Sequence, residues 1–271
     1  MNIHVSNTGS LRQNTDLSIV EQPMEWLEAF QDNWLAHLEK TGEANWSVYS
    51  RVSNKFTPSG KAVRLSESRL LFISSVGAYL PGSQDPFDEF NPLGDYSTRL
   101  IPSSTPFDEI DYANAQIDLS AVQQDPQTLL PLEHLHRLVE KGKLGELAPE
   151  FISFNGYHPH AIRVVKELIP SILKTAKRHQ VNAALLVPCS PLCVQSAGLV
   201  ARALEVNGIA TTISTNNGKY VKLTAPPRAT ISNQAPNCVL GAPHNHARQQ
   251  QVLAATLALL EQDAPLEFIE I

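Results

Sequence analysis

Cysteine is scarce in this chain, with three residues among 271. An odd count this small cannot build a disulfide framework. The opening stretch, "MNIHVSNTGSLRQNTDLS", is predominantly polar and holds no arginine-flanked apolar region of the kind that a secretory signal needs. We therefore expect a cytoplasmic protein whose thiols are reduced.

Long apolar runs and long basic runs are also missing. No run approaches the ~20 apolar residues that a helix needs to cross a bilayer. The net charge is −6, and no basic stretch offers the footprint of a phosphate-binding surface. We therefore expect neither a membrane nor a nucleic acid as a partner, and we expect a small-molecule substrate instead.

Three regions follow one another along the chain. Residues 1–20 show no periodicity, and we expect them to be mobile. Residues 21–60 form a helix and a linker, and residues 61–271 form an α/β domain. The helix carries an apolar stripe at helical spacing: Trp26, Leu27, Phe30, Trp34, Leu35 and Leu38. This stripe should dock on the main body or on a second subunit, and we expect a homo-oligomer.

The third region alternates between short apolar strands and amphipathic helices. The predicted strands are 69–74, 151–154, 183–187, 209–214 and 228–232, and the predicted helices are 131–144, 160–179, 194–206 and 247–262. Such alternation implies right-handed crossovers and a mainly parallel open sheet with helices on both faces, in Rossmann-like layers. Pro170 falls inside the second helix and should kink or break it.

In an open α/β sheet, ligands bind beyond the carboxyl ends of the strands. Arg228 follows two prolines at the mouth of a strand and could clamp a carboxylate with two donors. The substrate-binding candidates are Ser74, Ser75, Gly77, Gly156, Tyr157, Ser190 and Arg228.

Two cysteines lie four positions apart in "VPCSPLC", directly after a predicted strand. Ser190 suits the N-cap of the next helix and Pro191 suits its first position, which places Cys193 in the first turn. Free backbone N–H groups there favour a thiolate and can lower a cysteine pKa from ~8.5 towards 7 or below. We therefore expect Cys193 to be a catalytic nucleophile and Cys189 to be its resolving thiol.

Two other functions remain open at this point. Cys189 and Cys193 could bind zinc or iron together with His158 or His244, although no cofactor is required by the sequence. The chain could also be a small-molecule binding protein of the same fold without catalysis. His134, His136 and His179 lie in helical segments with charged neighbours, and we expect them to face solvent.

Five stretches carry a resemblance to a known family. They are "GDYSTRLIPSSTP", "LHRLVEKGKLGELAPEFISFNGY", "LLVPCSPLCVQSAGLVARALEVNGIAT", "APPRA" and the "GAP…QQQVL" end. Together they resemble the glycine/sarcosine/betaine reductase component B (selenoprotein B) family, in a short, cysteine-containing form related to D-proline reductase. The resemblance covers about residues 60 to 262, and "PCSPLC" is among its most specific parts.

The resemblance implies an oxidoreductase. In that family a selenocysteine at a comparable turn attacks the substrate, a carbon–nitrogen bond is cleaved reductively, and the selenoether passes to partner subunits. By position, Cys189 and Cys193 match the selenocysteine motif. The resemblance implies a small amine or amino-acid-like substrate, and a thiol electron donor or partner reductase subunit. This chain has cysteine in place of selenocysteine and no segment that would supply the family's pyruvoyl group.

Overall fold

The computed structural model describes residues 19–271. The predicted mobile segment 1–20 lies outside this range except for Ile19 and Val20, both of which are buried. The chain forms an eight-stranded sheet in which seven strands follow the order β10-β9-β8-β7-β1-β6-β3. These strands are β10 (Ile269–Glu270), β9 (Ala229–Ile231), β8 (Ala210–Thr215), β7 (Ala183–Val187), β1 (Arg69–Ser74), β6 (Glu150–Ser153) and β3 (Arg99–Pro102).

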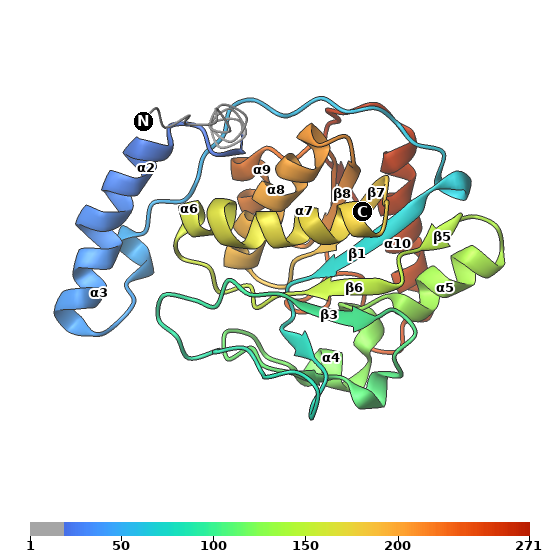
Figure 1. The fold of residues 1–271 in the computed structure, drawn as a ribbon, viewed down its shortest axis with the longest axis horizontal. Helices are drawn as coiled ribbons and strands as arrows, with labels where there is room; N and C mark the ends of the chain where they lie inside the picture. Colours follow the sequence, from blue (N-terminus) through green and yellow to red (C-terminus); the bar gives the residue numbers. More distant parts are fainter. Residues whose placement is uncertain (1–18) are drawn as a thin grey trace, which may run out of the picture.

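Parallel pairing runs from β10 across the sheet to β6, and β3 alone joins antiparallel at the edge of this path. A short strand, β5 (Glu146–Leu147), also pairs with β1 in parallel. Figure 1 shows β1, β6 and β3 side by side at the centre of the molecule. The predicted α/β fold with a mainly parallel sheet is confirmed.

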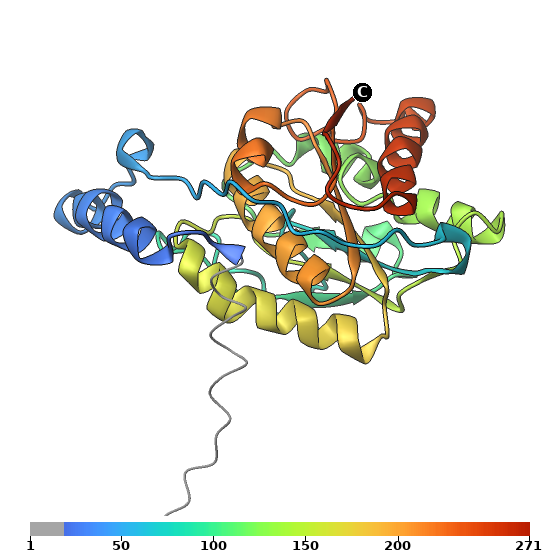
Figure 2. The same ribbon diagram turned by 90° about the horizontal axis from the view of Figure 1, so that it is seen from above.

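Helices cover both faces of the sheet because the strand residues alternate between two cores. Leu71 and Ile73 of β1 belong to the core under α7 (Ile169–Arg178) and α8 (Pro191–Val206). Leu70 and Phe72 belong to the core under α5 (Leu132–Glu140) and α10 (His246–Ala258). In Figure 2, α7 and α10 lie on opposite sides of the strands.

The helix around Pro170 does not break, although the sequence predicted a kink or a break there. Three segments follow one another without a gap: α6 (Ala161–Arg163), a π-helical turn at Val164–Leu168, and α7. Pro170 lies at the start of α7 and lacks the N–H that a regular α-helix would use. The π-helical turn just before it changes the bonding pattern locally, so the helix continues past the proline.

We call residues 19–59 the N-terminal arm, which begins with α2 (Pro23–Ala29), a π-helical turn (Phe30–Leu35) and α3 (Ala36–Thr41) and continues as a linker. Phe30 and Trp34 are fully buried, and Phe30 packs on His160 with 4.7 Å between the ring centroids. The apolar stripe therefore docks on the main body, which is one of the two outcomes that the sequence predicted. The chain then crosses the molecule to Gly60, which pairs with Ala264 (Figures 1 and 2).

Several short elements were not predicted. Helix α9 (Gly218–Thr224) connects β8 to β9, and β10 extends the sheet beyond β9. A separate two-stranded antiparallel sheet of β2 (Ala78–Tyr79) and β4 (Asp111–Tyr112), together with α4 (Ser120–Gln124), organises the region after β1. Within the described part of the chain, no helix has both the length and the apolar character to cross a bilayer.

A buried ion pair closes the amino edge of the sheet. Arg228 immediately precedes β9 and donates to both carboxylate oxygens of Glu205 at 2.9 and 3.1 Å, and both side chains are almost fully buried. The Glu205 carboxylate also accepts from the backbone N–H and the hydroxyl of Thr211 at 2.8 Å each. Each charge is therefore neutralised where water does not reach it.

Removing one partner of this pair should destabilise the fold strongly. Arg228→Met leaves the Glu205 carboxylate buried without its counter-charge, and we expect the free energy of unfolding to fall by about 3–5 kcal/mol. Urea denaturation measures the loss. The control is Arg64→Met, which removes the exposed pair with Glu67 and should cost less than about 1 kcal/mol. Equal losses in the two variants would contradict this account.

Candidate active site

The turn from β7 into α8 has the geometry that the sequence predicted. Ser190 is the N-cap, with an extended backbone, and its hydroxyl accepts the backbone N–H of Cys193 at 3.3 Å. Pro191 occupies the first turn of the helix, where a missing N–H costs little. Cys193 consequently lies in the first turn of a sixteen-residue helix, near its free N–H groups.

Cys189 and Cys193 form a pair of free thiols. Their sulfur atoms lie 3.5 Å apart, and both side chains are buried. The Cys189 thiol can donate either to the Cys193 sulfur or to the carbonyl of Ser75, which is 3.4 Å away. The Ser190 hydroxyl donates to the Cys193 sulfur at 2.8 Å. Cys193 is thus surrounded by donors that favour its thiolate.

Two residues from neighbouring strands hold the thiols in place. Ser75 follows β1, and its hydroxyl accepts the backbone N–H of Cys189 at 3.0 Å while lying 3.2 Å from the Cys189 sulfur. Gly156 follows β6, and a Cβ atom on it would come within 1.9 Å of the Cys193 sulfur. Only a glycine at position 156 leaves room for the thiol in this position.

The two thiols differ in their affinity for a proton. Burial alone would raise the pKa of Cys193, but hydrogen bonds from the Cys189 thiol and the Ser190 hydroxyl lower it to about 6. The pKa of Cys189 is raised, because its thiol proton is held by the Cys193 sulfur and because burial and the neighbouring negative charge both oppose its ionisation. Near neutral pH the pair therefore carries one negative charge, centred on Cys193.

A cavity of about 360 Å³ opens next to this pair at the carboxyl edge of the sheet. Cys189, rather than Cys193, lies in its wall. Polar side chains make up most of its other lining residues, namely Gln116, Asp118, Ser190, Asn216, Asn217, Gln234 and Asn237, and Ile117, Pro191 and Pro236 complete the wall. Amide groups and one carboxylate suit a small polar molecule that carries both hydrogen-bond donors and acceptors.

A second hollow of about 210 Å³ shares three residues with this cavity, namely Gln116, Ser190 and Pro191. Its remaining walls are Trp46, Arg51, Tyr157 and Leu192. The two hollows therefore adjoin across the turn that carries the thiols.

The predicted substrate-binding residues divide into three groups. Tyr157 and Ser190 line the hollows. Ser74 and Gly77 support the site from behind: the Ser74 hydroxyl donates to the Leu129 carbonyl, and Gly77 adopts a φ of 80° where a Cβ would strike the carbonyl of Ala113. Ser75 and Gly156 contact the thiols directly, as described above.

Arg228 is a correction to the sequence-based expectation. It precedes its strand and so lies at the amino edge of the sheet, whereas the cavity lies at the carboxyl edge. Its partner Glu205 is about 18 Å from Cys193 along α8, at ~1.5 Å per residue. Its guanidinium donates hydrogen bonds to Glu205 and to the carbonyls of Gln262, Thr211 and Lys61. Each of its nitrogens is therefore engaged, so it cannot bind the carboxylate of a substrate.

The predicted alternative metal site is not assembled. His158 is buried between the rings of Tyr96 and Phe154, and burial lowers its pKa to about 4. Its Nε2 donates to the carbonyl of Asp95 at 2.8 Å and its Nδ1 accepts from the hydroxyl of Ser196 at 3.0 Å, so neither nitrogen is free for a metal.

His244 is exposed, and its backbone N–H donates to Asp125. Across residues 19–271, no three or more His, Cys, Asp or Glu side chains are placed to hold a metal ion together. The four proposed ligands Cys189, Cys193, His158 and His244 therefore do not form one site.

Sequence reasoning missed most of the cavity wall. Trp46 and Arg51 come from the N-terminal arm, and Gln116 and Asp118 come from the loop after β4. None of these residues follows a predicted strand of the main sheet. Asn216 and Asn217 lie in the stretch "STNNG" after β8, where the rule for the carboxyl ends of the strands does direct attention, although they are not among the predicted substrate-binding residues.

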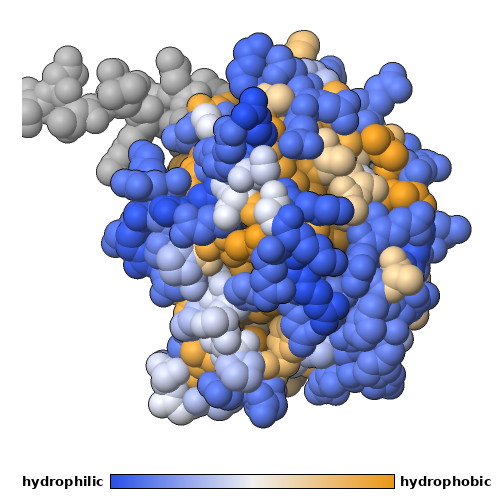
Figure 3. Space-filling view, turned by 90° about the vertical axis from the view of Figure 1, so that its right-hand side faces the viewer, coloured by the Kyte–Doolittle hydropathy of each residue, from blue (hydrophilic) through white to orange (hydrophobic). Residues whose placement is uncertain are grey.

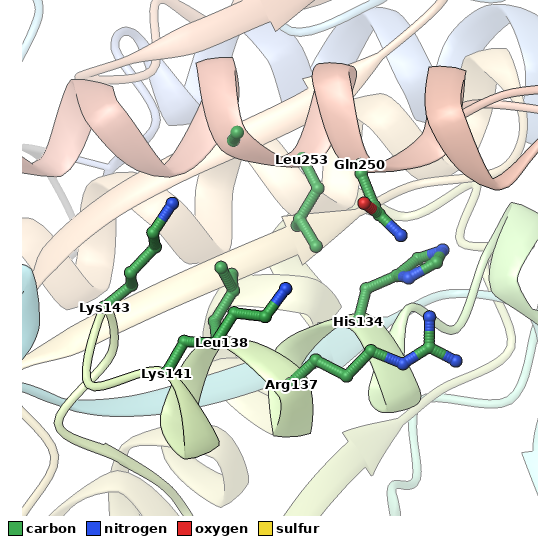
Figure 4. Close-up of a pocket in the computed structure, with 8 residues that line it drawn as sticks. His134, Arg137, Leu138, Lys141, Lys143, Gln250 and Leu253 are labelled. Carbon is green, nitrogen blue, oxygen red and sulfur yellow. The ribbon is translucent and has the colours of Figure 1, made fainter.

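A separate groove lies between α5 and α10, on the side where apolar side chains surface among hydrophilic ones (Figure 3). Its volume is about 160 Å³. In Figure 4, Arg137, Lys141 and Lys143 surround an apolar floor that includes Leu138 and Leu253. No cysteine lines this groove.

The same groove corrects one expectation about the histidines. His134 is buried rather than solvent-facing, with Nε2 2.9 Å from the side-chain oxygen of the buried Gln249. Burial lowers its pKa. His136 and His179 are partly buried, and each has a hydrogen-bond partner in the chain.

Comparison with known proteins identifies a distant relative. The D-proline reductase gamma subunit of Acetoanaerobium sticklandii is 26% identical over 196 residues, which cover 72% of this chain and 79% of that subunit. No family model matches the chain, and no solved structure matches it. The chain is thus a distant relative of a reductase subunit, while its assignment to the selenoprotein B family stays a prediction.

The thiol pair should alkylate with an unusual pH profile. In a Cys238→Ser background, which removes the remaining cysteine, we expect the iodoacetamide rate to rise with a midpoint near pH 6, where the Cys193 thiolate forms. Below that pH the thiolate is protonated and the rate should fall. In Cys193→Ser the midpoint should move above the ordinary ~8.5 of a free thiol, since burial opposes ionisation of Cys189. An unchanged midpoint would contradict the assignment.

Gly156→Ala should disturb the thiols directly. The added methyl group would overlap the Cys193 sulfur, so we expect the free energy of unfolding to fall by about 1–3 kcal/mol. We also expect the alkylation midpoint near pH 6 to be lost. Combining it with Cys193→Ala removes the sulfur and should recover part of the loss. A double-mutant cycle by urea denaturation measures this coupling, and additive effects would show that the contact is unimportant.

Proposed function

We propose that this chain is a thiol-dependent oxidoreductase that acts on a small, polar, amino-acid-like substrate through the Cys189–Cys193 pair. The observation that carries the proposal is two free thiols 3.5 Å apart at a helix start, one of them in the wall of a polar cavity. The distant relation to a D-proline reductase subunit supports a redox function. Asp118 is the single carboxylate in the cavity wall, and it can accept hydrogen bonds from an ammonium group of the substrate.

The cavity gives a reason to reverse the roles that the sequence suggested for the two thiols. Cys193 is favoured as the resting thiolate, but Cys189 is the sulfur that a molecule in the cavity meets. In this proposal Cys189 attacks the substrate while its thiol proton passes across 3.5 Å to the Cys193 thiolate, and because Cys193 is the weaker base the transfer is complete only when the new bond to Cys189 has formed. Cys193 next acts as the resolving thiol.

The proposed reaction is a two-electron reduction. The Cys189 sulfur displaces the amine from a substrate carbon, which forms a carbon–sulfur bond and breaks the carbon–nitrogen bond. The Cys193 sulfur then attacks the Cys189 sulfur and gives up the proton that it took from Cys189. The carbon leaves with the bonding electron pair and takes up a proton, while the two thiols become a disulfide. The substrate is thereby reduced, and the thiol pair is oxidised.

A second protein or a small dithiol must complete the cycle. The disulfide has to be reduced again, and we propose a thiol electron donor or a partner reductase subunit for this step. The relative is itself named as a subunit, which supports a partner. The predicted homo-oligomer stays a prediction.

Cystine tests the redox pair without any partner, because it is an amino-acid disulfide. Attack by one thiol releases a cysteine and leaves a mixed disulfide, and attack by the second thiol releases the other cysteine and leaves an internal disulfide. In a Cys238→Ser background, we expect the wild-type pair to lose two protons in intact-mass spectrometry. Cys193→Ser should accumulate the mixed disulfide at position 189, and Cys189→Ser should accumulate much less.

The outcomes separate the alternatives. A mixed disulfide that builds up in Cys189→Ser and not in Cys193→Ser would return the role of nucleophile to Cys193. Failure of the wild-type pair to form an internal disulfide would contradict the oxidoreductase proposal. Loss of a bound metal ion in both variants alike, measured on protein purified without an affinity tag, would favour the metal-dependent alternative.

A further inference from the structure

The N-terminal arm reaches the candidate active site through the segment from Trp46 to Val52. The buried side chain of Gln195, on α8, fixes this segment in two places: its amide nitrogen donates to the Tyr49 hydroxyl at 2.8 Å, and its oxygen accepts the backbone N–H of Val52 at 3.0 Å. The Tyr49 hydroxyl in turn donates to the carbonyl of Pro159 at 2.8 Å. The segment is thus bound to the same helix that carries Cys193.

Arg51 lies within this fixed segment and projects over the start of α8. Its guanidinium donates to the carbonyl of Pro191 at 3.2 Å and stacks over the ring of Tyr220, 4.1 Å from the centroid. Within residues 19–271, no carboxylate forms an ion pair with it. Arg51 is therefore held in place by a carbonyl and an aromatic face, while its positive charge stays available.

The hollow beside Arg51 is aromatic on its other side. Trp46 and Tyr157 meet edge to face with 5.8 Å between their centroids, and both line the hollow together with Arg51. Trp46 is 41% exposed, although it is the kind of side chain that burial favours. A cation beside an aromatic wall suits a carboxylate that is attached to a small apolar body.

We propose that Arg51 binds the carboxylate of the substrate, with Trp46 and Tyr157 forming the wall against its apolar part. This inference rests on the proposed function, because it places the carboxylate on one side of Ser190 and Pro191 and the reacting carbon on the other side, at Cys189. The site then selects small carboxylic acids, and the N-terminal arm supplies the selecting charge. Arg51 is a specificity residue that does not take part in the bond changes.

Two alkylating reagents that differ in charge test this assignment. Iodoacetate carries a carboxylate and iodoacetamide does not, and both react with the same thiol. In a Cys238→Ser background, we expect the ratio of the iodoacetate rate to the iodoacetamide rate at the Cys189–Cys193 pair to exceed the ratio for the same chain unfolded in urea. Arg51→Gln should lower the ratio about tenfold, as expected for loss of a charge-assisted hydrogen bond.

Two further variants make the test specific. Arg51→Lys keeps the charge but loses the planar fork, and should retain part of the ratio. Lys219→Gln is the matched control: it removes a positive charge that also lies near the Tyr220 ring, at 5.8 Å, but does not line the hollow, and it should leave the ratio unchanged.

Each outcome has a distinct meaning. A ratio that is the same in wild type and Arg51→Gln, with rapid reaction of iodoacetamide, overturns the role of Arg51 and leaves the reactive thiol pair standing. An equal loss in Arg51→Gln and Lys219→Gln also overturns it, because the effect would then be general surface charge. No reaction of either reagent at Cys189 or Cys193 in the folded chain overturns the reactive thiol pair and this inference with it.

Discussion

The close packing of the Cys193 sulfur on the backbone of Gly156 is the constraint on which the rest of the site depends. Three strand ends must reach one level for this contact to form. The parallel register provides this, since Ser74 at the end of β1 pairs with Ser153 of β6 and with Val187 of β7. The residues just beyond these ends are Ser75, Gly156 and Cys189. The sheet therefore positions the thiols before any side-chain interaction does so.

Charge then distinguishes two thiols that are alike in chemistry and burial. A buried site resists a second negative charge much more strongly than solvent does, so the pair ionises in steps and shares one charge. The helix start and the Ser190 hydroxyl draw that charge to Cys193. Cys189 keeps the proton but borders the cavity. The two sulfur atoms are 3.5 Å apart, so a proton can pass between them, but its resting place is Cys189, and its transfer to Cys193 is uphill until the Cys189 sulfur forms a new bond.

The sequence predicted what depends on local pattern. Strand β7, the Ser190 cap and the first-turn position of Cys193 follow from an apolar run and a serine–proline pair, and these features are as expected. The prediction that Arg228 binds substrate is wrong because it ignored the direction of β9. A residue that precedes a parallel strand lies at the amino edge of the sheet, and the cavity lies at the carboxyl edge. Trp46 and Arg51 line the second hollow because the chain crosses the molecule after α3, and no periodicity in the sequence predicts this path, so only the folded structure places them beside the turn that carries the thiols.

Helix α8 connects these parts, because its two ends meet opposite electrostatic demands. The amino end offers free N–H groups, and the thiolate charge of Cys193 is favoured there without a counter-ion. The carboxyl end presents free carbonyls, so the buried carboxylate of Glu205 is disfavoured there and requires Arg228 together with two donors from Thr211. Arg228 is therefore needed for stability at the carboxyl end of α8 and cannot bind a substrate anion. In our proposal Arg51, at the amino end of the same helix, binds that anion instead.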